Sequence, residues 1–214
     1  MVFVVAHEDS WAFSGEGEGS EASPYLITNV AQLQEMNLEL SAHYALGNDV
    51  DASEAVLLND GKGFEPIGDA TNTFMGTFDG SGFSLENLAI LRPSEDRVGI
   101  FRCAYEATIE NVKLDDINLI GRDYVGGVVG TAAKSRISNC AVDGRVAGSR
   151  GVGGIVGQNV SSDISLCDFT GVISGGDIVG GLIGLNSSGT VMNSFSNAEV
   201  SGLENVGGLI GGNY

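Results

Sequence analysis

The chain has 214 residues, 33 glycines and a formal net charge of −18, and all ten Lys and Arg residues lie between Lys62 and Arg150. Such an acidic surface repels phosphate backbones and anionic lipid, so we expect no nucleic-acid partner. No stretch approaches the roughly 18 consecutive apolar residues of a membrane-spanning helix, so we expect no membrane insertion. The apolar start Met1–Val5 is short, lacks a basic segment and does not fit a signal peptide.

The N-terminal part of the chain differs from the rest. Residues 1–27 are acidic and rich in Gly and Ser, which predicts a lead-in without regular structure. Thr28 or Asn29 is a suitable N-cap for a short helix. Its apolar face would carry Val30, Leu33, Met36 and Leu40. Because an atypical terminal element usually covers the end of a repeat array, we predict a capping helix and then a first β region. Residues 53–73 are expected to form an insertion loop, with a short strand at Phe64–Gly68 as the alternative.

A glycine-rich phrase then recurs at a fixed interval. The phrase is Val-Gly-Gly, two aliphatic residues and Gly, and its copies start at Val125, Val152, Val179 and Val206, each 27 residues after the last. A shortened copy starts at Val98. A fixed period of this size indicates a repeat architecture. The Gly pairs do not form a phosphate-binding loop, because no Lys-Ser or Lys-Thr follows them; we expect tight corners instead.

A second phrase follows the pattern apolar, any, Asn, apolar, any, apolar. Its copies start at Leu85, Ile109, Ile137, Ile164 and Val191. We expect the third position to turn a corner in the left-handed conformation, which Asn tolerates. A ladder of stacked corner amides would contain Asn87, Asn111, Asn139 and Asn193. Leu166 interrupts it, which predicts locally weaker hydrogen bonding. The fourth position would point inward and carry Leu88, Val112, Cys140, Cys167 and Ser194.

A third apolar phrase includes Val146, Ile173 and Val200, so each unit has three short β runs. Such runs are stable only when each pairs with its copy one coil along. The sequence therefore predicts an all-β, right-handed, three-sided parallel β-helix of 27-residue coils over residues 74–214. The last repeat stops partway, so we expect a piece of a longer protein and end-to-end β contacts at the open C-terminal coil.

Few residues qualify for catalysis. The only histidines are His7 and His43, which give neither a zinc-peptidase motif nor a Ser-His-acid triad within the repeats. Asp115 and Asp143 follow their apolar phrases at equivalent positions and would stack on adjacent coils. Paired acids on a β-helix suit glycoside or lyase chemistry, but no sugar-stacking aromatic residue accompanies them.

Metal and thiol sites are also weakly indicated. Calcium ligands would lie at Asn48–Asp51 or at Asp115–Asp116, although no EF-hand loop is present. Cys103, Cys140 and Cys167 do not form a disulfide framework, and the latter two fit a core position better than a catalytic one. We therefore assign no catalytic, cofactor-binding or metal-binding residue.

These phrases resemble the GLUG-motif repeats of bacterial surface and secreted proteins. The repeat phrases lie between Val98 and Gly211, and the stretch from Phe74 to Ile90 is similar to the usual upstream partner. Ser20–Ile27 and Tyr44–Asp51 are similar to the usual lead-in, so the resemblance covers about residues 15–214. Similar repeats occur in adhesin-like proteins and in noncatalytic parts of immunoglobulin A1 metallopeptidases. The resemblance implies an extracellular, noncatalytic stalk or adhesive surface that binds a host or matrix glycan or protein. A carbohydrate-active or carbohydrate-binding β-helix, and the scaffold of a surface peptidase, are the alternatives.

Overall fold

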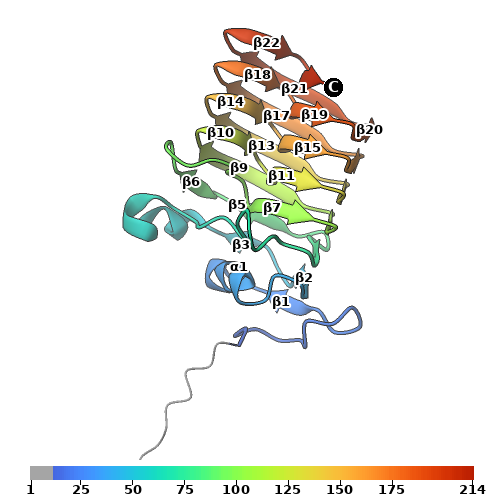
Figure 1. The fold of residues 1–214 in the computed structure, drawn as a ribbon. Coiled ribbons are helices and arrows are strands. Elements are labelled where there is room, and N and C mark those ends of the chain that lie inside the picture. The colour runs from blue at the N-terminus through green and yellow to red at the C-terminus, as the bar shows by residue number, and fades with distance from the viewer. Residues whose placement is uncertain (1–11) are drawn as a thin grey trace, which may run out of the picture.

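The computed structural model describes residues 12–214, which form a rod of stacked coils with the first and last coils at opposite ends (Figure 1). Strands pair in parallel with their counterparts one coil along. The predicted β-solenoid with coils of about 27 residues is therefore confirmed. Within the described residues, no helix is both long and apolar enough to cross a bilayer.

Four sheets run along the rod. Sheet I contains β1 (Tyr25–Ile27), β2 (His43–Leu46), β4 (Thr77–Asp79), β8 (Thr108–Glu110), β12 (Arg136–Ser138), β16 (Asp163–Ser165) and β20 (Thr190–Met192). Sheet II contains β3 (Val50–Asp51), β5 (Ser84–Glu86), β9 (Lys113–Ile120), β13 (Ala141–Ala147), β17 (Asp168–Ser174) and β21 (Phe195–Ser201), with β6 (Ala89–Leu91) also paired to β9.

The other two sheets are shorter. Sheet III contains β7 (Phe101–Tyr105), β11 (Val129–Ala133), β15 (Val156–Val160), β19 (Ile183–Ser187) and β23 (Ile210–Asn213). Sheet IV contains β10 (Asp123–Gly126), β14 (Arg150–Gly153), β18 (Asp177–Gly180) and β22 (Glu204–Gly207). The helical segments are α1 (Val30–Glu35) and the 3₁₀ turns η1 (Met36–Leu38), η2 (Ser53–Leu57) and η3 (Asn59–Gly61).

Each regular coil has four strands where the sequence predicts three, because the glycine phrase is divided by a bend. A Cβ on Gly153 would lie 2.4 Å from the Val156 carbonyl oxygen, so only glycine fits this bend. The last glycine of the phrase has a different role. A Cβ on Gly157 would lie 2.3 Å from the carbonyl carbon of Tyr124, a residue whose φ is 59°. The glycines of this phrase are therefore required where backbone segments contact each other closely, as predicted.

The repeated valines lie in one column. Val125, Val152, Val179 and Val206 are successive Cα partners along sheet IV. The third phrase is likewise in register along sheet II, where Val146 pairs with Ile173 and Ile173 with Val200. These pairings confirm that residues 27 positions apart stack on one another in the regular coils.

The corner prediction is confirmed for the regular coils. Asn111, Asn139, Leu166 and Asn193 all have left-handed φ values, at 56°, 53°, 55° and 50°. The side-chain ladder runs from Asn139 to Asn111 at 2.7 Å and from Asn111 to Asp79 at 2.8 Å. Leu166 ends it, although the Leu166 backbone N–H still donates to Met192 O at 3.1 Å. Hydrogen bonding is therefore lost only from the side chains.

The sequence pattern places Asn87 and Leu88 in the wrong column, although Asn87 has the predicted left-handed φ, at 59°, and Leu88 is buried as predicted. Leu85 pairs with Leu114 in sheet II and not with Ile109, and the Asn87 amide donates to Asp51 at 2.9 Å. Leu88 O accepts from Asn118 N at 2.9 Å, so Leu88 does not share the column of Cys140. The similar sequences that start at Leu85 and Ile109 suggest a coil of 24 residues. In the structure the coil is longer, because Leu85 pairs with Leu114.

The N-terminal turns confirm the helix and correct its surroundings. Asn29 is the N-cap of α1 and accepts from Gln32 N at 3.0 Å, and Leu33 and Met36 are fully buried. The last residues of the predicted lead-in form β1, which pairs with β2. Within the predicted insertion loop, Phe64 and Ile67 are also fully buried, so this stretch supplies core side chains.

Candidate functional site

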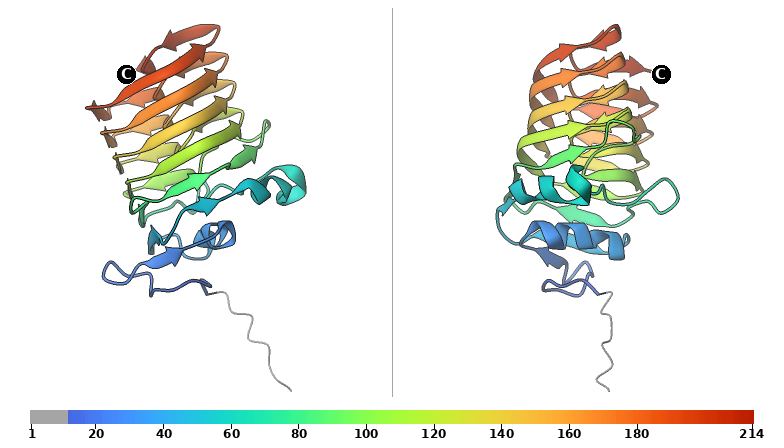
Figure 2. Two further views of the ribbon diagram at one scale, coloured as in Figure 1. Left: turned by 180° about the vertical axis from the view of Figure 1, so that it is seen from behind. Right: turned by 90° about the vertical axis from the view of Figure 1, so that its left-hand side faces the viewer.

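The least regular part of the rod is its N-terminal end, which contains α1 and the turns η2 and η3 (Figures 1 and 2). Two segments at this end form a groove. One wall is residues 34–41 and the other is residues 58–75. Three hollows of about 650, 370 and 300 Å³ lie along it. The largest hollow shares Asn37 and Glu65 with the second, and Leu40 and Asn72 with the third, so the three adjoin. We call this feature the N-terminal groove.

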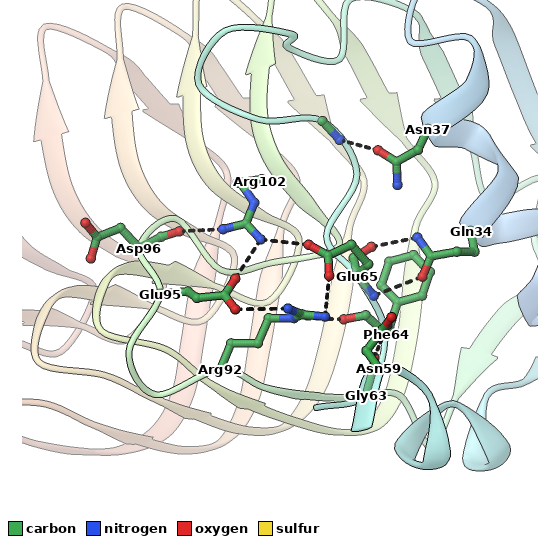
Figure 3. Close-up of polar contacts among 11 residues, drawn as sticks. Gln34, Asn37, Asn59, Gly63, Phe64, Glu65, Arg92, Glu95, Asp96 and Arg102 are labelled. Carbon is green, nitrogen blue, oxygen red and sulfur yellow. Dashed lines mark hydrogen bonds and ion pairs between the residues drawn. The ribbon is translucent and has the colours of Figure 1, made fainter. Parts of the chain in front are cut away.

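Hydrogen bonds fasten the two walls to each other. Gln34 makes a pair of bonds with the Glu65 backbone, donating to its carbonyl and accepting from its N–H, both at 2.9 Å. The Asn37 side-chain oxygen accepts from Gly68 N at 2.8 Å, and the Leu40 carbonyl accepts from Met75 N at 2.8 Å. Figure 3 shows the first three of these bonds. The groove is therefore held in one shape by hydrogen bonds between its own walls.

Beside the largest hollow, two arginines and two glutamates form a closed set of ion pairs (Figure 3), of which Glu65 and Arg102 line that hollow. Arg92 contacts Glu65 at 2.5 Å and Glu95 at 3.0 Å, and Arg102 contacts the same two carboxylates at 3.1 and 2.9 Å. The Arg92 side chain is only 3% exposed. Burial raises the pKa of Glu95, but the bonds from Arg102 and Arg92 outweigh it and hold that pKa below its ordinary value. We call these four residues the ion-pair knot.

The rim of the groove combines exposed apolar side chains with acidic ones. Leu38 is 44% exposed, Leu58 39% and Met75 49%. Asp69, beside them, accepts backbone N–H bonds from Asn72 and Thr71, which lower the pKa of its carboxyl group. Asp69 is therefore an ionised carboxylate on a partly apolar surface.

The predicted acid pair lies elsewhere, on the outer face of sheet II. Asp143 stands opposite the end of the Leu114–Asp115 run, where β9 carries an extra residue, and Thr170 and Asn197 continue the column. Lys113 Nζ binds the Asp115 carboxylate at 2.6 Å. The two acids therefore lie on neighbouring strands at a register shift and are not Cα partners, and Asp115 is already paired with a base.

The predicted calcium positions use their carboxylates within the fold. Asp49 accepts from Ser84 N at 2.8 Å, and Asp51 accepts from Ser53 N and from the Asn87 side chain. Asp116 is the extra residue of β9, with a φ of 54°. Among residues 12–214, no three His, Cys, Asp or Glu side chains come together as a metal site would require.

The histidines and cysteines are dispersed. His43 lies on β2 opposite Thr77, and His7 lies outside the described residues. Cys140 and Cys167 are buried in adjacent coils as predicted, and their shared hydrogen bond, together with burial, raises the pKa of the Cys140 thiol. Cys103 is buried on sheet III, and burial raises its thiol pKa as well.

Sequence reasoning missed two features. The residues of the N-terminal groove carry no motif, and their only signal is that residues 34–75 do not follow the repeat. A buried amide ladder also escaped notice. Asn159 donates to Asn186 at 2.9 Å and Asn186 to Asn213 at 2.7 Å, and the 27-residue spacing of these three asparagines is visible in the sequence.

Comparisons with known proteins bear on this architecture. Residues 27–144, more than half of the chain, match the model of the M26 IgA1-specific metallo-endopeptidase N-terminal region. The chain belongs to this family. The matched span of the M26 N-terminal region runs from β1 into β13 and so includes both walls of the groove.

Individual relatives of this M26 N-terminal region are much longer proteins. Halomucin of Haloquadratum walsbyi is 37% identical over 140 residues, which are 62% of this chain but 2% of that protein. An immunoglobulin A1 protease of Streptococcus sanguinis is 31% identical over 120 residues, 56% of this chain and 6% of the protease. The chain therefore spans a small fraction of either relative.

A solved structure shares the fold. The crystal structure of a candidate immunoglobulin A1 protease from Bacteroides ovatus superimposes with a TM-score of 0.65 at 22% identity, covering 90% of this chain and 72% of that chain. At this identity the match concerns the fold alone. The resemblance to the repeats of such peptidases is thus confirmed, and it concerns an N-terminal region and not a catalytic domain.

Proposed function

We propose that the chain is a noncatalytic, extracellular solenoid segment of a larger surface peptidase-like protein. The match to the M26 N-terminal region over residues 27–144 carries this proposal. In the same span the coils are continuous, and no cluster of metal-ligating side chains interrupts the described residues. An immunoglobulin A1 protease among the relatives supports an extracellular location.

The physical role is that of a stiff spacer which also presents a surface. Each coil adds about 4.8 Å of rod length, and continuous backbone ladders resist bending. A spacer of this kind separates a catalytic domain from its anchor at a fixed distance. The adhesive surface and the end-to-end contacts that we expect from the sequence stay predictions.

A test for hidden catalysis comes first. The purified chain is incubated with immunoglobulin A1 and with a panel of polysaccharides, and the products are followed by mass spectrometry. We expect no turnover, and no difference between the wild type and the Asp143→Ala variant. Hydrolysis that disappears in Asp115→Ala or Asp143→Ala would instead identify a carbohydrate-active β-helix.

A second measurement addresses adhesion. Binding of the labelled chain to arrays of glycans and matrix proteins is compared with binding of Asp143→Ala. Saturable binding to one class supports the adhesive role, and uniform weak binding removes it without affecting the spacer role.

A further inference from the structure

We propose that the N-terminal groove binds an extended, basic segment of polypeptide. This inference goes beyond the proposed function and does not depend on it, because a spacer or an enzyme can equally carry such a groove.

The shape of the groove suits an extended chain. Its three adjoining hollows follow one another between the two walls. The walls lie side by side in the same chain direction, because the first hollow joins Gln34 to Leu58 and the last joins Ser41 to Met75. The bonds from Gln34, Asn37 and Leu40 to the opposite wall fix its width before any ligand arrives. A preformed groove loses less entropy on binding than a flexible one.

The chemistry of the lining favours a peptide over a sugar. No aromatic side chain lines the three hollows within the described residues, so no ring is present for a sugar to stack on. Leu38, Leu58 and Met75 instead offer exposed apolar contacts along the length. Alternate side chains of an extended peptide point to one side and reach such contacts together. The Asn37 amide nitrogen has no partner among residues 12–214 and is available to a peptide carbonyl.

The charge around the groove selects a basic partner. Residues 12–61, which supply one wall and the turns beside it, contain nine Asp and Glu residues and no Lys or Arg. Arg102 lines the largest hollow, but it and Arg92 are each paired with both Glu65 and Glu95, so neither charge is left without a carboxylate. The ionised Asp69 remains on the rim. Lys62 is the only Lys or Arg in the two walls, against five Asp and Glu residues, so Lys or Arg side chains on the ligand would meet a negative potential.

Three fluorescent peptides of about 12 residues, roughly 40 Å when extended, test the proposal by fluorescence anisotropy. One alternates Lys with Leu and Val, the second replaces each Lys by Glu, and the third replaces each apolar residue by Ser. We expect saturable binding of the first alone, weakened as NaCl rises from about 0.05 M to about 0.5 M.

Variants locate the binding site. In the double variant Leu38→Ser/Met75→Ser we expect affinity for the first peptide to fall about tenfold or more, because two apolar contacts are removed. The matched control is Met192→Ser, since Met192 is 56% exposed at the far end of sheet I. The Asp69→Asn variant keeps the oxygen that holds the Thr71 and Asn72 amides but lacks the charge, and it should lower affinity about threefold and reduce the salt dependence.

Several results would overturn the proposal. Equal binding of the acidic peptide, an equal loss of binding in Met192→Ser, or no binding of the basic peptide at low salt would each do so. Circular dichroism of every variant confirms that the coils remain folded. None of these outcomes concerns catalysis, so failure here leaves the spacer role intact, and turnover in the earlier assay leaves the groove intact.

Discussion

The two halves of the rod solve the same packing problem in different ways. From Asp123 onward every complete coil repeats four strands at the same interval, and its interior is filled mainly by Val and Ile, with Phe169 as its one fully buried aromatic side chain and a buried Asn ladder. In the N-terminal turns the strands are interrupted by helical segments, and the interior holds a run of aromatic contacts. Ring centroids are 4.6 Å apart for Phe13 and Tyr25, 5.5 Å for Tyr25 and Tyr44, and 4.6 Å for Phe74 and Phe101. Bulky side chains fill irregular space, whereas identical small ones allow identical coils to stack. Repetition thus produces a stiff rod, and departure from repetition produces the groove.

The largest effect should come from a methyl group placed in the glycine column of the regular coils. A Cβ on Gly154 would lie 2.2 Å from Cγ of the buried Phe169, whereas one on Gly208, at the equivalent place in the last coil, meets nothing within 4 Å. We expect Gly154→Ala to lower the free energy of unfolding by about 3 kcal/mol or more and Gly208→Ala to change it by less than about 0.5 kcal/mol. Urea denaturation measures both, and equal effects would show that the corner is not tightly packed.

The buried amide ladder gives the next largest effect. Asn159 is fully buried, donates to Asn186 and to Ser162 O, and accepts from Ser162 N at 3.1 Å. Asn159→Ala leaves these partners unsatisfied, so we expect a loss of about 2–3 kcal/mol. Ala132 holds the equivalent position one coil earlier, so the backbone accepts alanine there. The control is Asn213→Ala at the exposed end of the ladder, for which we expect less than about 0.5 kcal/mol. A similar small loss at Asn159 would mean that water replaces the amide.

The sequence predicts the regular half well because period and packing coincide there. Val125 and its three copies stack as their spacing requires, and Asn111 and Asn139 turn their corners as their conformational preference indicates. Where the coil length varies, local sequence similarity predicts the wrong register. Asn87 occupies an Asn-Leu context like that of Asn111-Val112 but lies in another sheet, because coil closure and not local similarity sets the register.

The N-terminal groove could not be predicted from the sequence for a different reason. Its walls meet through Gln34 and Glu65, which are 31 residues apart and have no repeat to align them. The burial of Phe64 and Ile67 depends on tertiary packing, since their local sequence, rich in Gly and Asp, favours a loop. The ion-pair knot likewise joins Arg92 and Arg102 to Glu65 across separate turns, and no spacing rule connects them.

The knot makes the irregular half sensitive to acid. The folded pKa of Glu95 lies below its ordinary value, because the bonds from Arg102 and Arg92 outweigh the opposing effect of burial. Its contribution to stability is therefore complete above the unfolded pKa of about 4.3 and is lost as pH falls through the lower folded pKa. We expect Glu95→Gln to cost about 2 kcal/mol at neutral pH and to flatten the decline in stability below about pH 5.

Hydrogen exchange locates this effect. In Glu95→Gln the amides of residues 58–75 should exchange faster, while those of sheet IV stay protected. The control is Asp143→Asn, an exposed carboxylate with no ion pair among the described residues, which should leave the exchange pattern unchanged. Uniform acceleration along the rod would indicate that the two halves unfold as one unit.

The smallest effect restores regularity where the repeat itself departs from its pattern. Leu166 holds the left-handed corner with a φ of 55° and is 57% exposed, so its side chain bears the conformational cost and gains little burial. Leu166→Asn supplies a residue that tolerates this conformation and an amide next to Asn139, so we expect a gain of about 1 kcal/mol. The reverse change Asn139→Leu, at the same corner one coil earlier, should lose a similar amount. Thermal unfolding of both variants measures the pair. A neutral Leu166→Asn together with a destabilising Asn139→Leu would show that the ladder stabilises the rod only in the part that continues to Asp79. The conformational preference of Asn at the corner would then add nothing to stability.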